Sequence, residues 1–154
     1  MIHRTLYASR SEDWETPQHL YDRLDAIFAF ALDACAAPSN AKARAFFTRA
    51  EDALAQDWAP YGRVWLNPPY GREIGRWMAK AYEESRKGAL ILALVPARTD
   101  TRWWHASVSG KALVTFLPGR LKFLRDGQSL SPAPFPSALL LYPPSVETLV
   151  AALP

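Results

Sequence analysis

Residues 64–71 read VWLNPPYG, and this stretch restricts the possible fold more than any other part of the chain. Its three large apolar residues predict a buried strand, and the two prolines that follow cannot continue a sheet because neither has an N–H for the ladder. Pro68 also biases Asn67 toward an extended conformation. The sequence therefore predicts a strand that stops abruptly and presents an amide, Asn67, and a phenol ring, Tyr70, at fixed positions beyond its end.

Helical and strand patterns alternate along most of the chain. Helices are predicted at 16–28, with Thr16 as N-cap and Pro17 as first helical residue, at 74–87, at 101–108, and at 146–153 with Ser145 as cap. Strands are predicted at 30–33, 64–66, 89–95, 112–117, 121–124 and 137–142, and 41–49 is predicted to be helical or turn-like. This order predicts an α/β fold with a mostly parallel twisted sheet, helices on both faces and an antiparallel hairpin at the C-terminal end.

Polar residues stand at the ends of several predicted strands. Asp33, Asn67 and the run Pro96-Ala97-Arg98 each follow an apolar segment. In open α/β sheets, ligands bind beyond the carboxyl ends of the strands. The sequence therefore predicts that these residues share one functional edge of the sheet.

Composition and cysteine content exclude several classes of protein. The 154 residues are 49% hydrophobic and 21% charged, which fits one globular domain. No apolar run is long enough to span a membrane, and the first residues lack the apolar region of a signal peptide. Cys35 is the only cysteine, which excludes an internal disulfide and a cysteine-based zinc site and favours a reducing cytoplasm. The three histidines are scattered, so we predict no metal site.

Charge is distributed unevenly along the chain. Residues 1–60 carry six lysines and arginines against nine acidic residues, whereas residues 61–154 carry twelve against six. Aromatic residues are interleaved with the cations at 102–105 (RWWH) and at 120–125 (RLKFLR). Because cations hold phosphates while aromatic rings stack on bases, this pattern indicates that the second half faces a nucleic acid. A basic, solvated surface without a partner is the alternative interpretation.

The Asn-Pro-Pro-Tyr stretch suits chemistry on a planar amine such as the 6-amino group of adenine. The lone pair of that nitrogen is delocalised into the ring, so the amine is a poor nucleophile. Two hydrogen-bond acceptors, the side-chain carbonyl of Asn67 and the backbone carbonyl of Pro68, would draw the nitrogen toward tetrahedral geometry and free the lone pair. Tyr70 could stack on the base, which would have to be flipped out of a duplex. An ordinary turn is the alternative.

Asn-Pro-Pro-Tyr after a strand resembles the catalytic motif of amino-methyltransferases that use S-adenosylmethionine. The whole chain resembles the small phage and prophage DNA N6-adenine methyltransferases of the Dam type. The matching segments cover most of the chain in the family's order: DWETPQHLYDRL (13–24), FALDACAAPSNAK (30–42), DALAQDW (52–58), VWLNPPYG (64–71), LVPARTDTRWWH (94–105), GRLKF (119–123) and PFPSALLL (134–141). The resemblance implies one Rossmann-like methyltransferase domain over residues 1–154, without a separate target-recognition domain.

The resemblance also implies roles for individual residues. The catalytic loop would consist of Asn67, Pro68, Pro69 and Tyr70. The residues implied to bind S-adenosylmethionine, with S-adenosylhomocysteine as product, are Thr16, Pro17, Asp33, Ala34, Asp52, Asp57, Trp58 and Asn67. The residues implied to face DNA are Arg98, Arg102, Arg120, Lys122 and Phe123. The expected partner is double-stranded DNA in the cytoplasm of a phage-infected or prophage-carrying bacterium, with hemimethylated or single-stranded DNA and a monomer or homodimer left open.

One departure from the family lies after the first predicted strand. Most such methyltransferases have a Gly-x-Gly loop there, whereas this chain has LDACAAPSNA. Three functions therefore remain open: site-specific or relaxed methylation of adenine N6 in DNA; methylation of another planar amine, such as cytosine N4, an RNA guanine or a protein glutamine; and non-catalytic nucleic-acid binding on a degenerate methyltransferase fold. Asn rather than Ser at position 67 favours adenine over cytosine.

Overall fold

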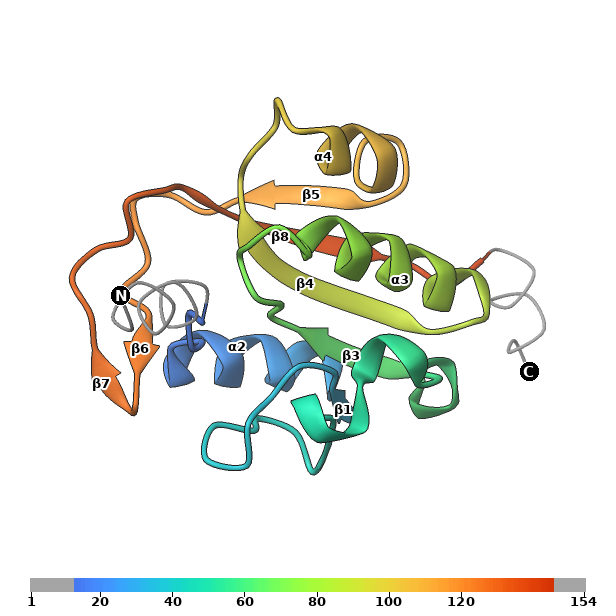
Figure 1. Cartoon of the computed structure of the whole chain (residues 1–154), viewed down its shortest axis with the longest axis horizontal. Helices are drawn as coiled ribbons and strands as arrows, with labels where there is room; N and C mark the ends of the chain where they lie inside the picture. Colours follow the sequence, from blue (N-terminus) through green and yellow to red (C-terminus); the bar gives the residue numbers. More distant parts are fainter. Residues whose placement is uncertain (1–12, 146–154) are drawn as a thin grey trace, which may run out of the picture.

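The structure, a computed structural model, describes residues 13–145, and the helix predicted at 146–153 lies outside the described residues. Three α-helices, α2 (Gln18–Phe28), α3 (Ile74–Arg86) and α4 (Arg102–Ser107), accompany two sheets (Figure 1). The larger sheet contains β1 (Leu32–Asp33), β2 (Ala45–Phe46), β3 (Arg63–Leu66), β4 (Leu90–Pro96), β5 (Leu113–Phe116) and β8 (Ser137–Tyr142). A separate two-stranded ribbon is formed by β6 (Leu124–Arg125) and β7 (Gln128–Ser129). Short 3-10 helices cover Arg49–Glu51, Ala53–Ala55 and Ala59–Tyr61.

The larger sheet is mixed, with the strand order β2-β1-β3-β4-β8-β5. Strands β2, β1, β3 and β4 pair in parallel, while β8 is antiparallel to both β4 and β5. The apolar runs at 64–66 and 89–95 form adjacent central strands, with Val64 opposite Ile91 and Leu66 opposite Ala93. The mostly parallel sheet and its antiparallel C-terminal strands are therefore confirmed.

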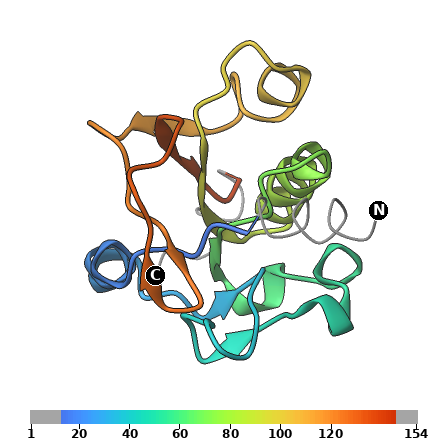
Figure 2. The same ribbon diagram turned by 60° about the vertical axis from the view of Figure 1, so that its left-hand side comes forward.

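Helices cover both faces of this sheet (Figure 2). On one face, the ring of Trp65 in β3 meets Tyr21 of α2 edge to face, with the ring centroids 5.6 Å apart. On the other face, the Tyr142 hydroxyl of β8 donates to the Ser107 carbonyl of α4 at 2.7 Å and lies 3.9 Å from the Met78 sulfur of α3. The alternation of side chains along the strands thus places α2 on the face opposite α3 and α4, and the prediction of helices on both faces is confirmed.

Three local predictions need correction. Thr16 does not cap α2: Pro17 is the N-cap, and its carbonyl accepts the N–H groups of Leu20 and Tyr21. The segment 41–49 contains β2 rather than a helix, because the Phe47 N–H continues the parallel pairing by donating to the Asp33 carbonyl at 3.0 Å. The run 121–124 does not join the larger sheet, since only Leu124 of that run is in a strand, and that strand belongs to the β6–β7 ribbon.

A buried carboxylate fixes the segment before β3 to helix α3. One oxygen of Glu84 accepts the N–H groups of Trp58 and Ala59, both at 2.8 Å, and the other accepts Lys80 and Lys87 at 2.8 and 2.9 Å. Burial tends to raise the pKa of this carboxyl group, but the four hydrogen bonds outweigh that effect and lower the pKa to about 2. Ionised Glu84 therefore stabilises the folded chain.

We predict that Glu84→Gln lowers the free energy of unfolding at neutral pH by roughly 3 kcal/mol, because the amide cannot accept all four donors. The folded pKa lies below the usual value of 4.5, so this stabilisation is present above about pH 4.5 and is lost as the pH falls toward about 2. Urea unfolding across this range should show a flatter pH dependence for the variant than for the wild type. The exposed neighbour provides the control, Glu83→Gln. Parallel pH dependences for Glu84→Gln and wild type would contradict the assignment.

Candidate active site

A cavity of about 560 Å³ lies at the carboxyl ends of β1 and β3. Its volume is within the range of sites that hold cofactors and drug-sized ligands. Four parts of the chain form most of its wall: residues 13–16 before α2, residues 33–40 after β1, residues 47–50 with Asp52 and Ala53, and Asn67, Pro68 and Pro69 after β3. The parallel strands thus bring the predicted strand-end residues Asp33 and Asn67 to one cavity.

The side-chain amide of Asn67 has one defined orientation. Its nitrogen Nδ2 donates to the backbone carbonyl of Trp14 at 2.6 Å and to the hydroxyl oxygen of Thr16 at 3.0 Å. The Trp14 carbonyl can only accept, so the amide nitrogen rather than the oxygen must face it. The oxygen Oδ1 is buried and has no hydrogen-bond partner among residues 13–145. A buried acceptor without a partner is rare and marks a position where a ligand can bind.

Asp33 organises the loop that follows β1. Its two carboxylate oxygens accept the N–H groups of Cys35 at 3.3 Å and Lys42 at 3.0 Å, which ties together the two ends of the loop. Burial raises the pKa of Asp33 to about 6, while the two backbone hydrogen bonds act in the opposite direction. Within the loop, the Asn40 side chain accepts the Ala37 N–H at 2.8 Å. Asp33 therefore shapes the cavity wall, and its direct contact with a cofactor stays a prediction.

Tyr70 lies in a cluster of four aromatic rings beside the strand end. Its hydroxyl donates to the Leu94 carbonyl of β4 at 2.9 Å, and its ring meets Phe123 and Phe135 nearly at right angles, with centroids 5.9 and 5.7 Å away. The ring of Trp14 packs against the same two phenylalanines at 5.6 and 5.1 Å. Phe123 is completely buried, so it is a core residue of this cluster rather than a residue on the DNA-facing surface.

The predicted cofactor residues separate into two groups. Thr16, Ala34 and Asp52 line the cavity with Asp33 and Asn67, and the buried Pro17 adjoins it at the start of α2.

The structure does not bring Asp57 and Trp58 to the cavity. Trp58 is fully buried against α3, where its N–H binds Glu84 and its ring nitrogen donates to the Ala53 carbonyl at 2.9 Å. Asp57 is exposed and forms an ion pair with Lys87 at 3.4 Å. Both residues attach the segment before β3 to helix α3. This corrects the prediction that they line the adenosine pocket.

Sequence reasoning missed two contributors to the site. Trp14 acts through its backbone carbonyl, which has no residue-type signal, although its ring also packs in the aromatic cluster. Phe135 stands between prolines in the PFPS segment, and a bulky ring in such a stiff loop is a signal that could have indicated packing. Both residues lie close to the strand end that carries Asn67 and Tyr70.

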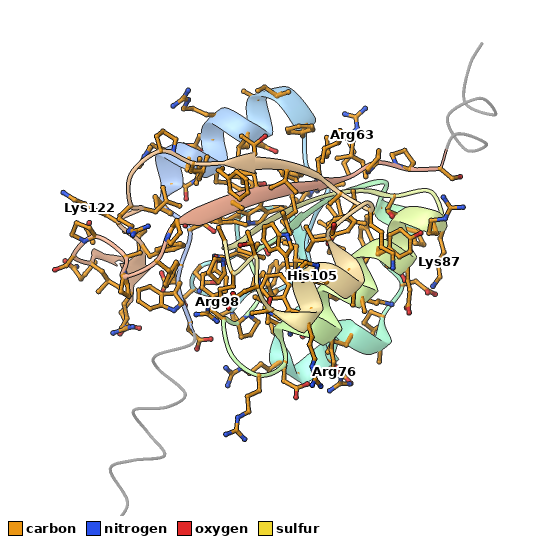
Figure 3. All side chains as sticks on the ribbon, turned by 90° about the horizontal axis from the view of Figure 1, so that it is seen from above. Arg63, Arg76, Lys87, Arg98, His105 and Lys122 are labelled. Atoms are coloured by element: carbon orange, nitrogen blue, oxygen red, sulfur yellow. The ribbon has the colours of Figure 1, made fainter. Side chains whose placement is uncertain are left out.

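The predicted DNA-facing cations differ in exposure. The guanidinium of Arg98 lies over the Phe135 ring, 5.9 Å from its centroid, and is half-buried. Arg102, Arg120 and Lys122 are exposed. Figure 3 shows Lys122 at one end of the molecule and Lys87 at the opposite end, with Arg98 on the Lys122 side. The labelled cations of the second half thus lie on several sides of the molecule, and Arg98 and Lys122 lie on the same side (Figure 3).

Two further properties concern residues 13–145 alone. No three histidine, cysteine, aspartate or glutamate side chains in this range are grouped closely enough to hold a metal ion, and the expectation of a metal-free site stays a prediction. No helix in the same range is long and apolar enough to cross a membrane.

An α/β sheet with a cavity beyond its parallel strands and an Asn-Pro-Pro-Tyr loop at a strand end defines the class of amino-methyltransferases. Comparison with known proteins specifies the family: residues 4–144 match the family described as DNA N-6-adenine-methyltransferase (Dam), and the chain belongs to it. The DNA N-6-adenine-methyltransferase of Escherichia phage T1 is 29% identical over 115 residues, which are 74% of this chain and 48% of that protein. The chain thus spans about half the length of that relative. The putative methyltransferase YfdM of Escherichia coli (strain K12) is 34% identical over 65 residues, which are 38% of this chain and 71% of that protein.

Membership of this family implies S-adenosylmethionine as the cofactor. The cavity fits such a group in size. Its wall after β1 carries the small side chains of Ala34, Cys35, Ala36 and Ala37, which leave room beside the backbone. Asn67, whose buried Oδ1 has no partner among residues 13–145, lines the same cavity after the neighbouring parallel strand β3. The residues present are therefore suited to hold the cofactor next to a second, polar ligand.

We predict that Asp33→Ala loosens the loop after β1. Without the carboxylate, the N–H groups of Cys35 and Lys42 lose their acceptor, and their amide hydrogen exchange should accelerate by about tenfold or more. Asp33→Asn keeps one acceptor oxygen, so its amide exchange rates at Cys35 and Lys42 should lie between those of the wild type and Asp33→Ala. Hydrogen exchange followed by NMR measures this directly, with the exposed residue Asp100→Ala as control. Unchanged protection of both amides in Asp33→Ala would contradict the role of Asp33.

Proposed function

We propose that this protein transfers a methyl group from S-adenosylmethionine to the 6-amino group of adenine in DNA. Its family supports this class of reaction. The observation that carries the proposal is the Asn67 amide, which gives both hydrogens to Trp14 and Thr16 and leaves Oδ1 without a partner among the described residues. An amine with two hydrogens is the kind of ligand that such an acceptor binds, because it can donate one hydrogen to Oδ1 and keep the other for a second acceptor.

The chain's own residues would activate the amine through position and charge rather than through a strong base. Oδ1 of Asn67 accepts one N6 hydrogen and the backbone carbonyl of Pro68 accepts the other, so the nitrogen lone pair is drawn out of conjugation with the ring. Asn67 remains neutral throughout, and the N6 proton is released to water once the new bond has formed. When bound, S-adenosylmethionine supplies an electrophilic methyl group. Fixed acceptors of this kind are typical of sites that work by preorganisation.

The cavity wall would hold the cofactor with groups of two kinds. The loop after β1 offers backbone groups beside the small side chains of Ala34 and Ala36. The exposed carboxylate of Asp52 also lines the cavity and is suited to accept hydrogen bonds from ribose hydroxyls at the adenosine end. Asp33 supports these contacts through the loop that it fixes.

The aromatic cluster would receive the base. Tyr70 is the ring next to the catalytic prolines, and stacking on a flipped adenine is the role that we assign to it. Because Tyr70 is buried against Phe123 and Phe135, binding of the base requires these two phenylalanines to shift. Both belong to the segment between β5 and β8, which also carries Arg120 and Lys122. Double-stranded DNA, in the cytoplasm of a bacterium that carries the phage or prophage, is the proposed substrate.

We predict that Asn67→Ala lowers methyl transfer by about a hundredfold or more, because an oriented acceptor is lost from the reacting nitrogen. Folding and cofactor binding should be retained, as measured by circular dichroism and calorimetry. The assay is transfer of labelled methyl groups to unmodified duplex DNA followed by nucleoside analysis, with label expected in N6-methyladenine. A second amide outside the cavity provides the control, Gln56→Ala. An Asn67→Ala variant nearly as active as the wild type would contradict the proposed role of Asn67 in activating the amine.

The DNA-facing role of the basic segment predicts a change in salt dependence. Arg120→Ala and Lys122→Ala should each weaken DNA binding and reduce the slope of log K against log salt by about 1, since one phosphate contact is lost in each. Fluorescence anisotropy with a labelled duplex over a salt series measures this slope. Arg86→Ala, at the end of α3 that lies away from the cavity, is the matched control. Slopes equal to that of the wild type in both variants would remove Arg120 and Lys122 from the DNA-binding surface.

A further inference from the structure

We propose that the Trp14 carbonyl and the Thr16 hydroxyl together orient the catalytic amide, and that this pair, the Asn67 clamp, makes an amide rather than a carboxylate the required group at position 67. The inference rests on the proposed function and deepens it. It assigns Thr16 as a positioning residue, which acts on the substrate amine only through Asn67.

The clamp binds both hydrogens of the Asn67 amide nitrogen and leaves the amide oxygen without a partner. Nδ2 has two hydrogens, and the structure gives it two acceptors, at 2.6 Å from Trp14 and 3.0 Å from Thr16. A hydroxyl alone could not select the orientation, because it can donate as well as accept. The Trp14 carbonyl removes this ambiguity, since an amide turned by half a rotation would place two oxygens against each other. Oδ1 is therefore kept for a ligand.

The same contacts should strengthen Oδ1 as an acceptor. An amide that donates two hydrogen bonds becomes more polarised, and its carbonyl oxygen gains negative charge. Thr16 is 3% exposed, so this polarisation is weakly screened. The clamp thus both orients the Asn67 amide and makes its Oδ1 a stronger hydrogen-bond acceptor.

A carboxylate at position 67 would not satisfy the clamp. Asp has no hydrogen to donate, so one of its oxygens would face the Trp14 carbonyl at a distance that suits only a donor and an acceptor. The Thr16 hydroxyl could still donate to that carboxylate, but the Trp14 backbone carbonyl can only accept a hydrogen bond and never donate one. Trp14 therefore determines which residue type the catalytic position accepts in this chain.

The clamp is held in place by the β6–β7 ribbon. Glu15, between Trp14 and Thr16, exchanges two backbone hydrogen bonds with Leu124, at 3.1 and 2.9 Å. Its side chain also accepts the Asp126 N–H at 2.9 Å. These three bonds fix the backbone on both sides of Glu15, so the Trp14 carbonyl and Thr16 cannot follow a rotation of the amide.

The first test separates positioning from cofactor binding. Thr16→Val removes the hydroxyl at nearly constant volume and should lower kcat for methylation of duplex DNA by about tenfold, because one orienting hydrogen bond is lost. Thr16→Ser keeps the hydroxyl and should stay within about threefold of the wild type. The dissociation constant for S-adenosylmethionine should change little in either variant. Weaker cofactor binding with unchanged kcat in Thr16→Val would overturn the positioning role and make Thr16 a cofactor ligand.

The second test does not require activity. The chain contains two asparagines, Asn40 and Asn67, so protein labelled with ¹⁵N-asparagine gives only two pairs of side-chain amide signals. In the wild type, the Asn67 pair should exchange slowly with solvent, and Thr16→Val should accelerate it by about tenfold while the Asn40 pair is unchanged. Equal exchange in both proteins would overturn the clamp. Slow, Thr16-dependent exchange in a protein that transfers no methyl group to DNA would support the clamp and refute the proposed function instead.

The requirement for an amide at position 67 is tested by a separate variant. Asn67→Asp should lose at least as much kcat as Thr16→Val, although a carboxylate is a stronger acceptor than an amide. An Asn67→Asp variant as active as the wild type would overturn the requirement for an amide.

Discussion

The parallel pairing of β1, β3 and β4 is the constraint on which the site depends. Leu32 lies opposite Val64, and Val64 lies opposite Ile91, so the three strands run in one direction and end at the same edge of the sheet. The chain leaves β1 at Asp33 and β3 at Leu66, which brings a carboxylate and the Asn67 amide to one cavity. Asp33 then binds the Lys42 N–H at the other end of its own loop, whereas Asn67 binds residues that precede α2 and are distant in sequence.

Three buried polar groups show how this fold distinguishes structural from functional sites. Glu84 accepts four hydrogen bonds and Asp33 accepts two, so both carboxylates are used to hold backbone segments in place. The Asn67 Oδ1 accepts none from the described residues. Leaving a buried acceptor without a partner costs about 1–3 kcal/mol, which a purely structural amide would avoid by turning toward a donor. The Trp14 carbonyl prevents that rotation, so the cost is built into the site itself.

The parts of the fold that could be predicted from the sequence are those with a local cause. Apolar runs and helical spacing identified β3, β4, β8 and α3, and the two prolines located the strand end that carries Asn67. The errors have non-local causes. β2 forms because its backbone pairs with β1, not because Ala45–Phe46 is a strong strand signal. Thr16 has the sequence signature of a helix cap, but its hydroxyl is taken by Asn67, far along the chain. Trp14 acts through a backbone carbonyl, which any residue could supply.

The loop after β1 shows why the missing Gly-x-Gly does not exclude a cofactor site. Glycine has two uses in such a loop: it adopts positive φ, and it lacks a side chain. Within residues 13–145, the non-glycine residues with positive φ are Ala29, Asp52 and Asp126, and none of them lies in the loop. The loop therefore needs no left-handed residue, because hydrogen bonds to Asp33 and Asn40 fold it with ordinary backbone angles. Alanine does not remove the side chain as glycine does, but a single methyl group at Ala34, Ala36 and Ala37 keeps the cavity wall close to the backbone.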